Sequence, residues 1–108
     1  MDELAADRVR GAAEVRAGAP GTTVVALRGE IDISNVDELA AVISDRLPEV
    51  PGAVVVDASG LDFLDSSGIA LLLRLSARAD TLVIRSPTHV VRRVIGAAGL
   101  TDVLGVEP

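Results

Sequence analysis

The chain has 108 residues, of which 49% are hydrophobic, so its size fits one ordinary domain with a real core. Its 10 basic residues, all arginine, against 16 acidic residues give a net charge of -6, which disfavours nucleic acids and anionic membrane surfaces as main targets. The absence of cysteine excludes disulfides, thiolate zinc sites and a cysteine nucleophile, and a single aromatic residue, Phe63, argues against stacking on nucleic acid bases.

The amino-terminal end carries no pattern of an export signal. Met1-Asp2-Glu3-Leu4 is acidic rather than basic, and no apolar run approaches the roughly 20 residues of a membrane span. We therefore expect a soluble, cytoplasmic protein. Residues 1–10 are polar without a clear period, and we expect them to form a loosely ordered lead or a short helix.

The first part of the chain predicts a β-hairpin. A strand is expected within residues 12–17, and the turn Gly18-Ala19-Pro20-Gly21 separates it from a β-branched run over residues 22–28. We expect Gly29-Glu30-Ile31-Asp32 to be a loop that leads out of the sheet.

A helix and a central strand follow. Ser34 and Asp37 resemble a capping box, and apolar residues then recur on one helical face: Val36, Leu39, Ala40, Ile43 and Leu47. Pro48 and Pro51 end this helix. The β-branched run over residues 53–57 predicts a strand buried on both faces.

The second half of the chain predicts two more helices and two more strands. A helix is expected from about Ser66 to Ala79, and a short strand over residues 81–85. Ser86 is expected to cap a third helix, with Pro87 at its first position, and Gly99 to stop it after about Ala98. A last short strand is expected within residues 102–106.

The expected order is β-β-α-β-α-β-α-β. It predicts an α/β fold in which a mixed, mostly parallel sheet is opened by an N-terminal hairpin and accompanied by about three helices. The loops 29–34 and 58–67 leave carboxyl ends of strands, where binding sites of such sheets lie. We expect polar residues of both loops to gather at one edge: Glu30, Asp32, Asp57, Asp62, Asp65, Ser66 and Ser67.

Asp65-Ser66-Ser67-Gly68 is the most informative segment, because it places a carboxylate and two hydroxyls where a strand gives way to an apolar helix. Asp65 or Ser66 is the natural N-cap, and Gly68 permits close approach of another backbone. Helix capping alone is the simplest interpretation of an isolated segment of this kind.

Three enzymatic or ligand-binding interpretations have weak support. A serine hydrolase needs a base near its nucleophile, and the single histidine, His89, lies at the expected start of the third helix without a G-x-S-x-G elbow. A phosphate-binding loop lacks both its glycine spacing and a lysine. An acidic Mg²⁺ site of the receiver type lacks the lysine that such domains need.

The segment Asp57 to Gly68, D-A-S-G-L-D-F-L-D-S-S-G, resembles the signature of the STAS-domain anti-sigma factor antagonists, the bacterial anti-anti-sigma factors. Gly29 to Asp32 is similar to their G-E-[IL]-D turn. Ser86-Pro87, the V-R-R-V segment at residues 91–94 and Gly99-Leu100 are similar to their later motifs. These matches run in order from about residue 12 to residue 106, and residues 1–108 are expected to form one STAS domain.

The resemblance implies a regulator that is not an enzyme and uses no cofactor or metal. Unmodified, it binds an anti-sigma factor serine kinase and frees a sigma factor, and phosphorylation of Ser66 ends that binding. Ser67 is the competing acceptor, and a metal-dependent phosphatase of the PP2C type is expected to reset the site. The candidate partner-binding residues are Glu30, Asp32, Asp65, Ser66, Ser67, Gly68, Ile69 and Leu71. For Leu71 two alternatives stay open: it is exposed on its helix as a contact for the kinase, or it is covered by other parts of the domain.

Two other functions stay open at this point. One is a STAS scaffold or ligand-sensing module that is not phosphorylated, and the other, from a different class, is a small nucleotide-binding domain. Many family members have a further C-terminal helix beyond the position of Pro108. Without it one sheet face is less covered, so weak self-association is a further expectation.

Overall fold

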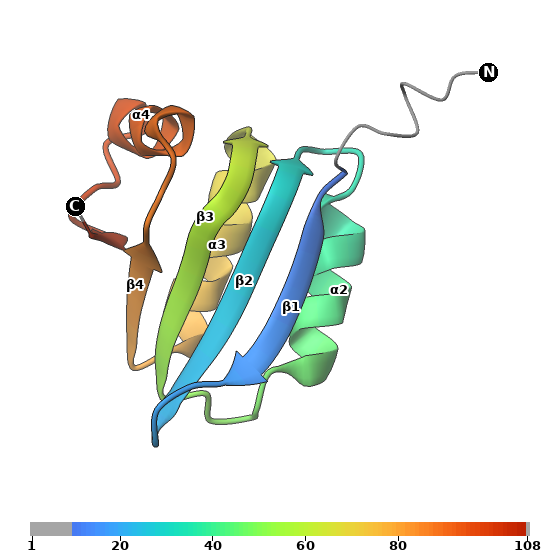
Figure 1. Cartoon of the computed structure of the whole chain (residues 1–108), viewed down its shortest axis with the longest axis vertical. Coiled ribbons are helices and arrows are strands. Elements are labelled where there is room, and N and C mark those ends of the chain that lie inside the picture. The colour runs from blue at the N-terminus through green and yellow to red at the C-terminus, as the bar shows by residue number, and fades with distance from the viewer. Residues whose placement is uncertain (1–9, 108) are drawn as a thin grey trace.

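The computed structural model describes residues 10–107, which form a five-stranded sheet and three helices (Figure 1). The sheet order is β1-β2-β3-β4-β5, and β1 is antiparallel to β2 whereas the other neighbours are parallel. The strands are β1 (Ala12–Ala17), β2 (Thr22–Ile31), β3 (Ala53–Leu64), β4 (Thr81–Arg85) and β5 (Gly105–Val106), and the helices are α2 (Val36–Arg46), α3 (Ser66–Arg78) and α4 (His89–Ala97). The predicted element order and mixed, mostly parallel sheet are confirmed. The expectation for residues 1–9 lies outside the described residues.

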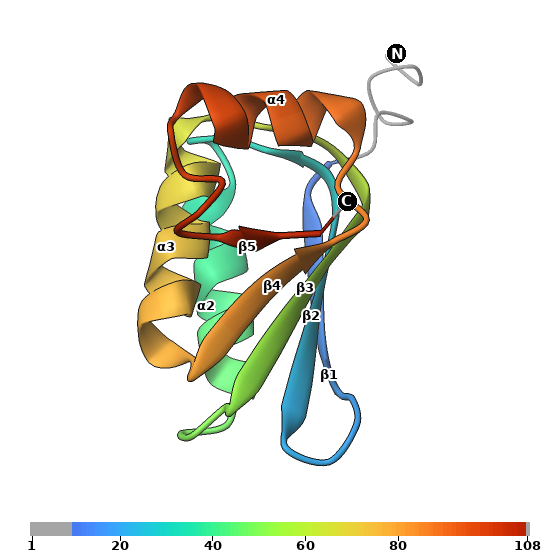
Figure 2. The ribbon, with the colours of Figure 1, turned by 90° about the vertical axis from the view of Figure 1, so that its left-hand side faces the viewer.

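The helices α2 and α3 cover the same face of the sheet (Figure 2). The parallel strands follow one another in the sheet in chain order, so crossovers of one handedness place these helices on one side. The burial of β3 alternates accordingly: Val54 and Val56 are buried, while Val55 and Asp57 are half-buried. The expectation that residues 53–57 are buried on both faces is therefore wrong.

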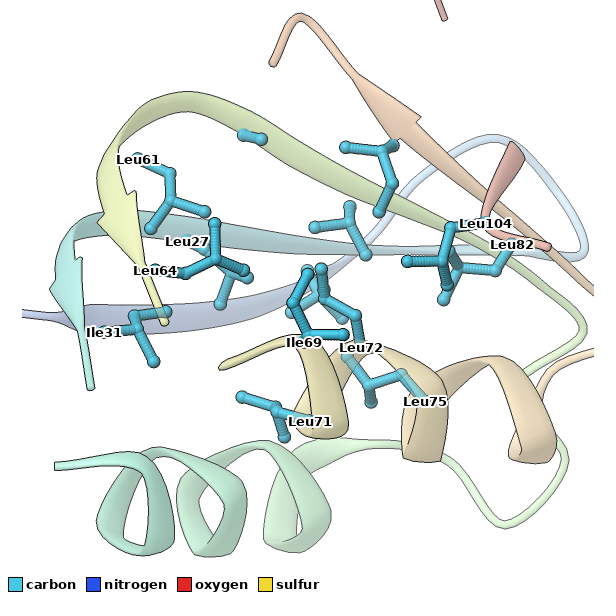
Figure 3. Packing of buried hydrophobic residues seen from close by; sticks show 14 of the residues in the cluster. Leu27, Ile31, Leu61, Leu64, Ile69, Leu71, Leu72, Leu75, Leu82 and Leu104 are labelled. Carbon is cyan, nitrogen blue, oxygen red and sulfur yellow. The ribbon is translucent and has the colours of Figure 1, made fainter. Parts of the chain in front are cut away.

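An aliphatic core fills the space between the sheet and these helices (Figure 3). Its fully buried side chains come from every layer, with Leu27 on β2, Leu61 and Leu64 on β3, and Leu72 on α3. Burial of a leucine side chain contributes about 2 kcal/mol. The core therefore fixes the positions of the carboxyl ends of β2 and β3 relative to α3.

Both central strands are longer than the sequence pattern predicted. Residues 29–31 belong to β2 and residues 58–64 to β3, where loops were expected. Leu61 and Leu64 are 1% exposed, so this polar-looking segment is anchored in the core, and irregularities in the β2–β3 register accommodate it. Because β3 continues past Asp57, that carboxylate lies within the sheet and not at its edge.

The start of α4 also differs from the prediction. Thr88, not Ser86, is its N-cap: the Thr88 hydroxyl accepts a hydrogen bond from the Val91 amide at 3.3 Å and donates one to the Leu61 carbonyl at 3.0 Å. Thr88 thereby joins α4 to β3.

The predicted end of α4 at Gly99 is confirmed. Gly99 has a φ of 73°, and the Leu100 amide donates a hydrogen bond to the Ile95 carbonyl, which completes a Schellman motif.

Candidate partner-binding site

The turn into α3 is organised by the carboxylate of Asp65. One of its oxygens, Oδ1, accepts hydrogen bonds from the Ser67 amide at 2.9 Å, the Gly68 amide at 3.3 Å and the Ser67 hydroxyl. These amides belong to the first turn of α3 and have no partner within the helix. Of the two predicted N-caps, Asp65 and Ser66, the structure has Asp65 in this role.

The two serines of the turn occupy different environments. Ser67 is half-buried, and its hydroxyl is held by Asp65. Ser66 is the first residue of α3 and is exposed, and the side-chain hydrogen bonds found within residues 10–107 do not involve its hydroxyl. Of the two hydroxyls, the one on Ser66 is therefore free to meet a second molecule.

The loop after β2 lies directly beside this turn. The Asp65 amide donates a hydrogen bond to the Ile31 carbonyl at 3.2 Å. Asp65 therefore joins the ends of β2 and β3. Asp32 and Ser66 directly follow the two bonded residues, Ile31 and Asp65, which agrees with the expectation that both loops meet at one edge of the sheet.

The same loop has its own hydrogen bonds, which differ from the predicted capping box. Asp32 accepts hydrogen bonds from the amide and hydroxyl of Ser34, so Ser34 does not cap α2. The N-cap position belongs to Asn35, whose side chain makes no cap bond to the helix. Instead it accepts from the Asp32 amide at 3.0 Å and donates to the Glu30 carbonyl at 2.9 Å, which holds the loop closed.

The site carries negative charge. The hydrogen bond from the Ser67 hydroxyl lowers the pKa of Asp65, and the amides of Gly68, Ser67 and Ile33 lower it further against the opposing effect of burial. Asp65 is therefore ionised at neutral pH. Glu30, which is exposed on β2, and the half-buried Asp32 add further carboxylates on the neighbouring segment.

Two exposed apolar side chains on these same segments were not identified by the sequence reasoning. Ile33 is 81% exposed in the loop beside Asp65, and Phe63 is 40% exposed on β3, where it pairs in register with Glu30. Ile33 could have been noticed because it lies between Asp32 and Ser34, outside the apolar period of α2. Apolar side chains that gather into one exposed patch are typical of contact surfaces, whereas single exposed ones are common.

Three predicted partner-binding positions are buried. Ile69 is 7% and Leu71 is 3% exposed, and Figure 3 shows Leu71 between α3 and α2. Of the two alternatives for Leu71, the exposed one is wrong, because α2 covers that side of α3. Gly68 is also buried, and a Cβ there would lie 2.8 Å from the Cβ of Leu64, so the group that approaches it is a side chain and not another backbone.

Two predicted members of the polar cluster, Asp57 and Asp62, belong to β3 itself and not to a loop after it. Asp57 lies mid-strand opposite Arg85 of β4, and Asp62 is exposed on β3. Within residues 10–107, no group of three or more His, Asp or Glu side chains is suited to hold a metal ion.

The same residues contain no helix long and apolar enough to cross a membrane.

A family model described as Mlab, STAS domain, matches residues 15–105. The chain belongs to the STAS domain family. Within this family it is 32% identical over 84 residues to an anti-sigma F factor antagonist of Lysinibacillus sphaericus, an alignment that covers 73% of this chain and 72% of that protein.

Solved structures of anti-sigma factor antagonists agree with the fold. The crystal structure of an anti-sigma factor antagonist from Mycobacterium paratuberculosis matches with a TM-score of 0.77 and 27% identity, over 92% of this chain and 86% of that one. SpoIIAA, an anti-sigma factor antagonist, matches at 25% identity in its unphosphorylated form, with a TM-score of 0.63 over 90% of this chain and 89% of that one. The phosphorylated form of this Bacillus protein matches with a TM-score of 0.58, over 90% and 92%.

Proposed function

We propose that this STAS domain is an anti-sigma factor antagonist that binds an anti-sigma factor serine kinase when unmodified and thereby frees a sigma factor. Phosphorylation of Ser66 by that kinase ends the binding. The observation that carries the proposal is the exposed Ser66 hydroxyl, which stands free at the N-terminus of α3. The relatives named as anti-sigma factor antagonists support the same role.

The hydrogen bonds of the turn favour Ser66 over Ser67 as the phosphoacceptor. Phosphorylation of Ser67 would first require its hydroxyl to leave the Asp65 carboxylate, and would then place a dianion against that carboxylate. Ser66 loses no such bond. It also needs no movement of the helix to become accessible.

The proposed contact surface consists of Glu30, Asp32, Ile33, Phe63 and Ser66. Ile33 and Phe63 supply apolar anchors, and the carboxylates of Glu30 and Asp32 add negative charge on neighbouring positions of the same segments. Such a surface fits a kinase surface that offers an apolar pocket bordered by lysine or arginine. Gly68, Ile69 and Leu71 support this surface from below and do not belong to it.

The fold tolerates a phosphate on Ser66. A helix N-terminus favours negative charge through its free amides and its dipole, so α3 stays intact. The added charge of about -1.5 to -2 instead acts on the complex, because it must be desolvated beside the ionised Asp65. We propose that a metal-dependent phosphatase of the PP2C type restores the unmodified form.

The proposal is tested by incubating the protein with its cognate kinase and ATP and mapping the phosphate by mass spectrometry. We expect one phosphate on Ser66 in the wild type and in Ser67→Ala, and none in Ser66→Ala. Ser59→Ala serves as the matched control, because Ser59 makes the same pair of bonds to Asp57 that Ser67 makes to Asp65. A phosphate on Ser67 contradicts the assignment, and a kinase complex without any phosphate transfer supports a scaffold instead.

A further inference from the structure

A cleft of about 360 Å³ lies at the end of the molecule opposite Ser66. It is formed by the end of β1, the start of β2, the last residue of α2 and the loop that leads to β3. Both views place the β1–β2 turn and this loop at the end away from the carboxyl ends of β2 and β3 (Figures 1 and 2). The cleft is therefore separate from the proposed phosphorylation site.

The lining of the cleft combines apolar side chains with two arginines. Its apolar part includes Val15, Pro48 and Val50, and Val50 is 80% exposed, which is unusual for a valine. Arg16 and Arg46 supply the charge, and no lining residue is acidic. In a chain with a net charge of -6, two cations without a lining carboxylate make this cleft suited to an anion. A second cleft between α2 and α3 also has two arginines, Arg74 and Arg78, but its volume is only about 150 Å³.

The two arginines differ in how far they are already neutralised. Arg16 lies 3.6 Å from Glu14, and both side chains are more than half exposed, so this pair is weak. The ion pairs found within residues 10–107 do not include Arg46. A guanidinium prefers a carboxylate or phosphate that it can bind through two parallel hydrogen bonds.

We propose that this cleft binds a small amphipathic anion, with an apolar body against Val15, Pro48 and Val50 and a carboxylate or phosphate head at Arg46 and Arg16. Its volume lies within the range of about 300 to 1,000 Å³ that small-molecule sites occupy. The apolar wall favours an aliphatic body. The buried hydroxyl of Thr23 binds the Pro51 carbonyl at 3.0 Å and so fixes the loop that forms one wall.

The test is a titration of the labelled protein followed by two-dimensional amide NMR, with hexanoate, hexyl phosphate and the neutral hexanamide as probes. We expect saturable shifts at the amides of Thr22, Thr23 and Val50 with at least one anion and much smaller shifts with hexanamide. Saturation by hexanoate, by hexyl phosphate or by both decides which head group the site takes. Absence of saturable shifts with both anions, or equal shifts with hexanamide, overturns the proposal.

Two variants separate a specific site from general attraction of anions. Arg46→Gln should weaken anion binding about tenfold, since it removes a charge-assisted hydrogen bond. Arg74→Gln removes the same charge from the smaller cleft between α2 and α3 and should leave the affinity at the Arg46 cleft unchanged. Equal effects of the two variants contradict the proposal, and Val50→Glu, which places a carboxylate at the cleft, should abolish anion binding without changing the fold.

Discussion

Two Asp-x-Ser-Gly turns in this protein, at residues 57–60 and 65–68, have nearly the same local hydrogen bonds. In the first, Asp57 accepts from the Ser59 amide at 3.0 Å and from its hydroxyl at 2.8 Å. In the second, Asp65 accepts from the Ser67 amide at 2.9 Å and from its hydroxyl. Only the second becomes the proposed site of modification.

The difference comes from the element that follows each turn. After Asp57 the chain continues as β3, so the middle residue, Ala58, points into the core and is 0% exposed. After Asp65 the chain enters α3, and the middle residue, Ser66, is exposed on its first turn. The helix gives this turn both an outward serine and an N-terminus that favours negative charge, which the strand does not provide.

The largest expected difference between the turns is in the role of their aspartates. Asp65→Ala should lower the free energy of unfolding by about 2 kcal/mol, because first-turn amides of α3 lose their acceptor. Asp57→Ala should lower it by only about 0.5 kcal/mol, since Asp57 accepts its hydrogen bonds from the exposed Ser59 and caps no helix, and its attraction to nearby arginines is screened by solvent. Urea unfolding of both variants measures the difference, and equal losses would show that the cap does not distinguish the turns.

A smaller difference is expected at the glycines. In Gly68→Ala the new Cβ would lie 2.8 Å from the Cβ of Leu64, and this overpacking should destabilise the fold by about 2 kcal/mol. The higher helix propensity of alanine offsets about 1 kcal/mol of that loss. In Gly60→Ala the Cβ meets the Cγ of Arg28 at 2.9 Å, and this exposed side chain can move away. Thermal unfolding should show a net loss of about 1 kcal/mol for Gly68→Ala and none for Gly60→Ala; the reverse order would refute this account of the packing.

The pH dependence of stability sharpens the comparison further. In the folded state the pKa of Asp65 is lowered mainly by the Ser67 hydroxyl, and that of Asp57 mainly by the Ser59 amide and hydroxyl, with Arg16 and Arg85 adding to it. Each of the two carboxylates therefore stabilises the folded state above the pKa of an unfolded aspartate, about 3.9. This contribution is lost as the pH falls through the lower pKa that the carboxylate has in the folded state.

Asp65→Asn isolates this effect, because asparagine caps a helix about as well as aspartate but does not titrate. Stability measured between about pH 6 and about pH 2 should fall less steeply in Asp65→Asn than in the wild type, and likewise in Asp57→Asn. If the stability of either variant falls with pH as steeply as that of the wild type, the folded state does not stabilise the ionised form of the replaced carboxylate.

The fold was largely predictable from the sequence, since hydrophobic periods and turn residues such as Gly18 to Gly21 are local signals. The lengths of β2 and β3 could not be predicted in this way. Residues 58–64 look like a polar loop until Leu61 and Leu64 are seen in the core, and that burial depends on the helices packed over them. A strand end cannot be assigned from local composition when tertiary packing extends it.

The site was predictable only in part for a related reason. Asp65 as a cap followed from the type of residue and its place before an apolar helix. The burial of Leu71 depends on how α2 lies beside α3, and the exposure of Ile33 depends on a loop held by Asn35. Neither relation is present in the local sequence.

The most direct test of the central claim is the affinity of the cognate anti-sigma factor kinase for the protein with and without a phosphate on Ser66, measured by isothermal titration calorimetry. We predict that phosphorylation weakens binding by about 100-fold or more, since a desolvated dianion beside Asp65 costs several kcal/mol in the interface. The far-ultraviolet circular dichroism should stay unchanged, because α3 keeps its cap. Equal affinity of the two forms, or a loss of helix on phosphorylation, would contradict the account.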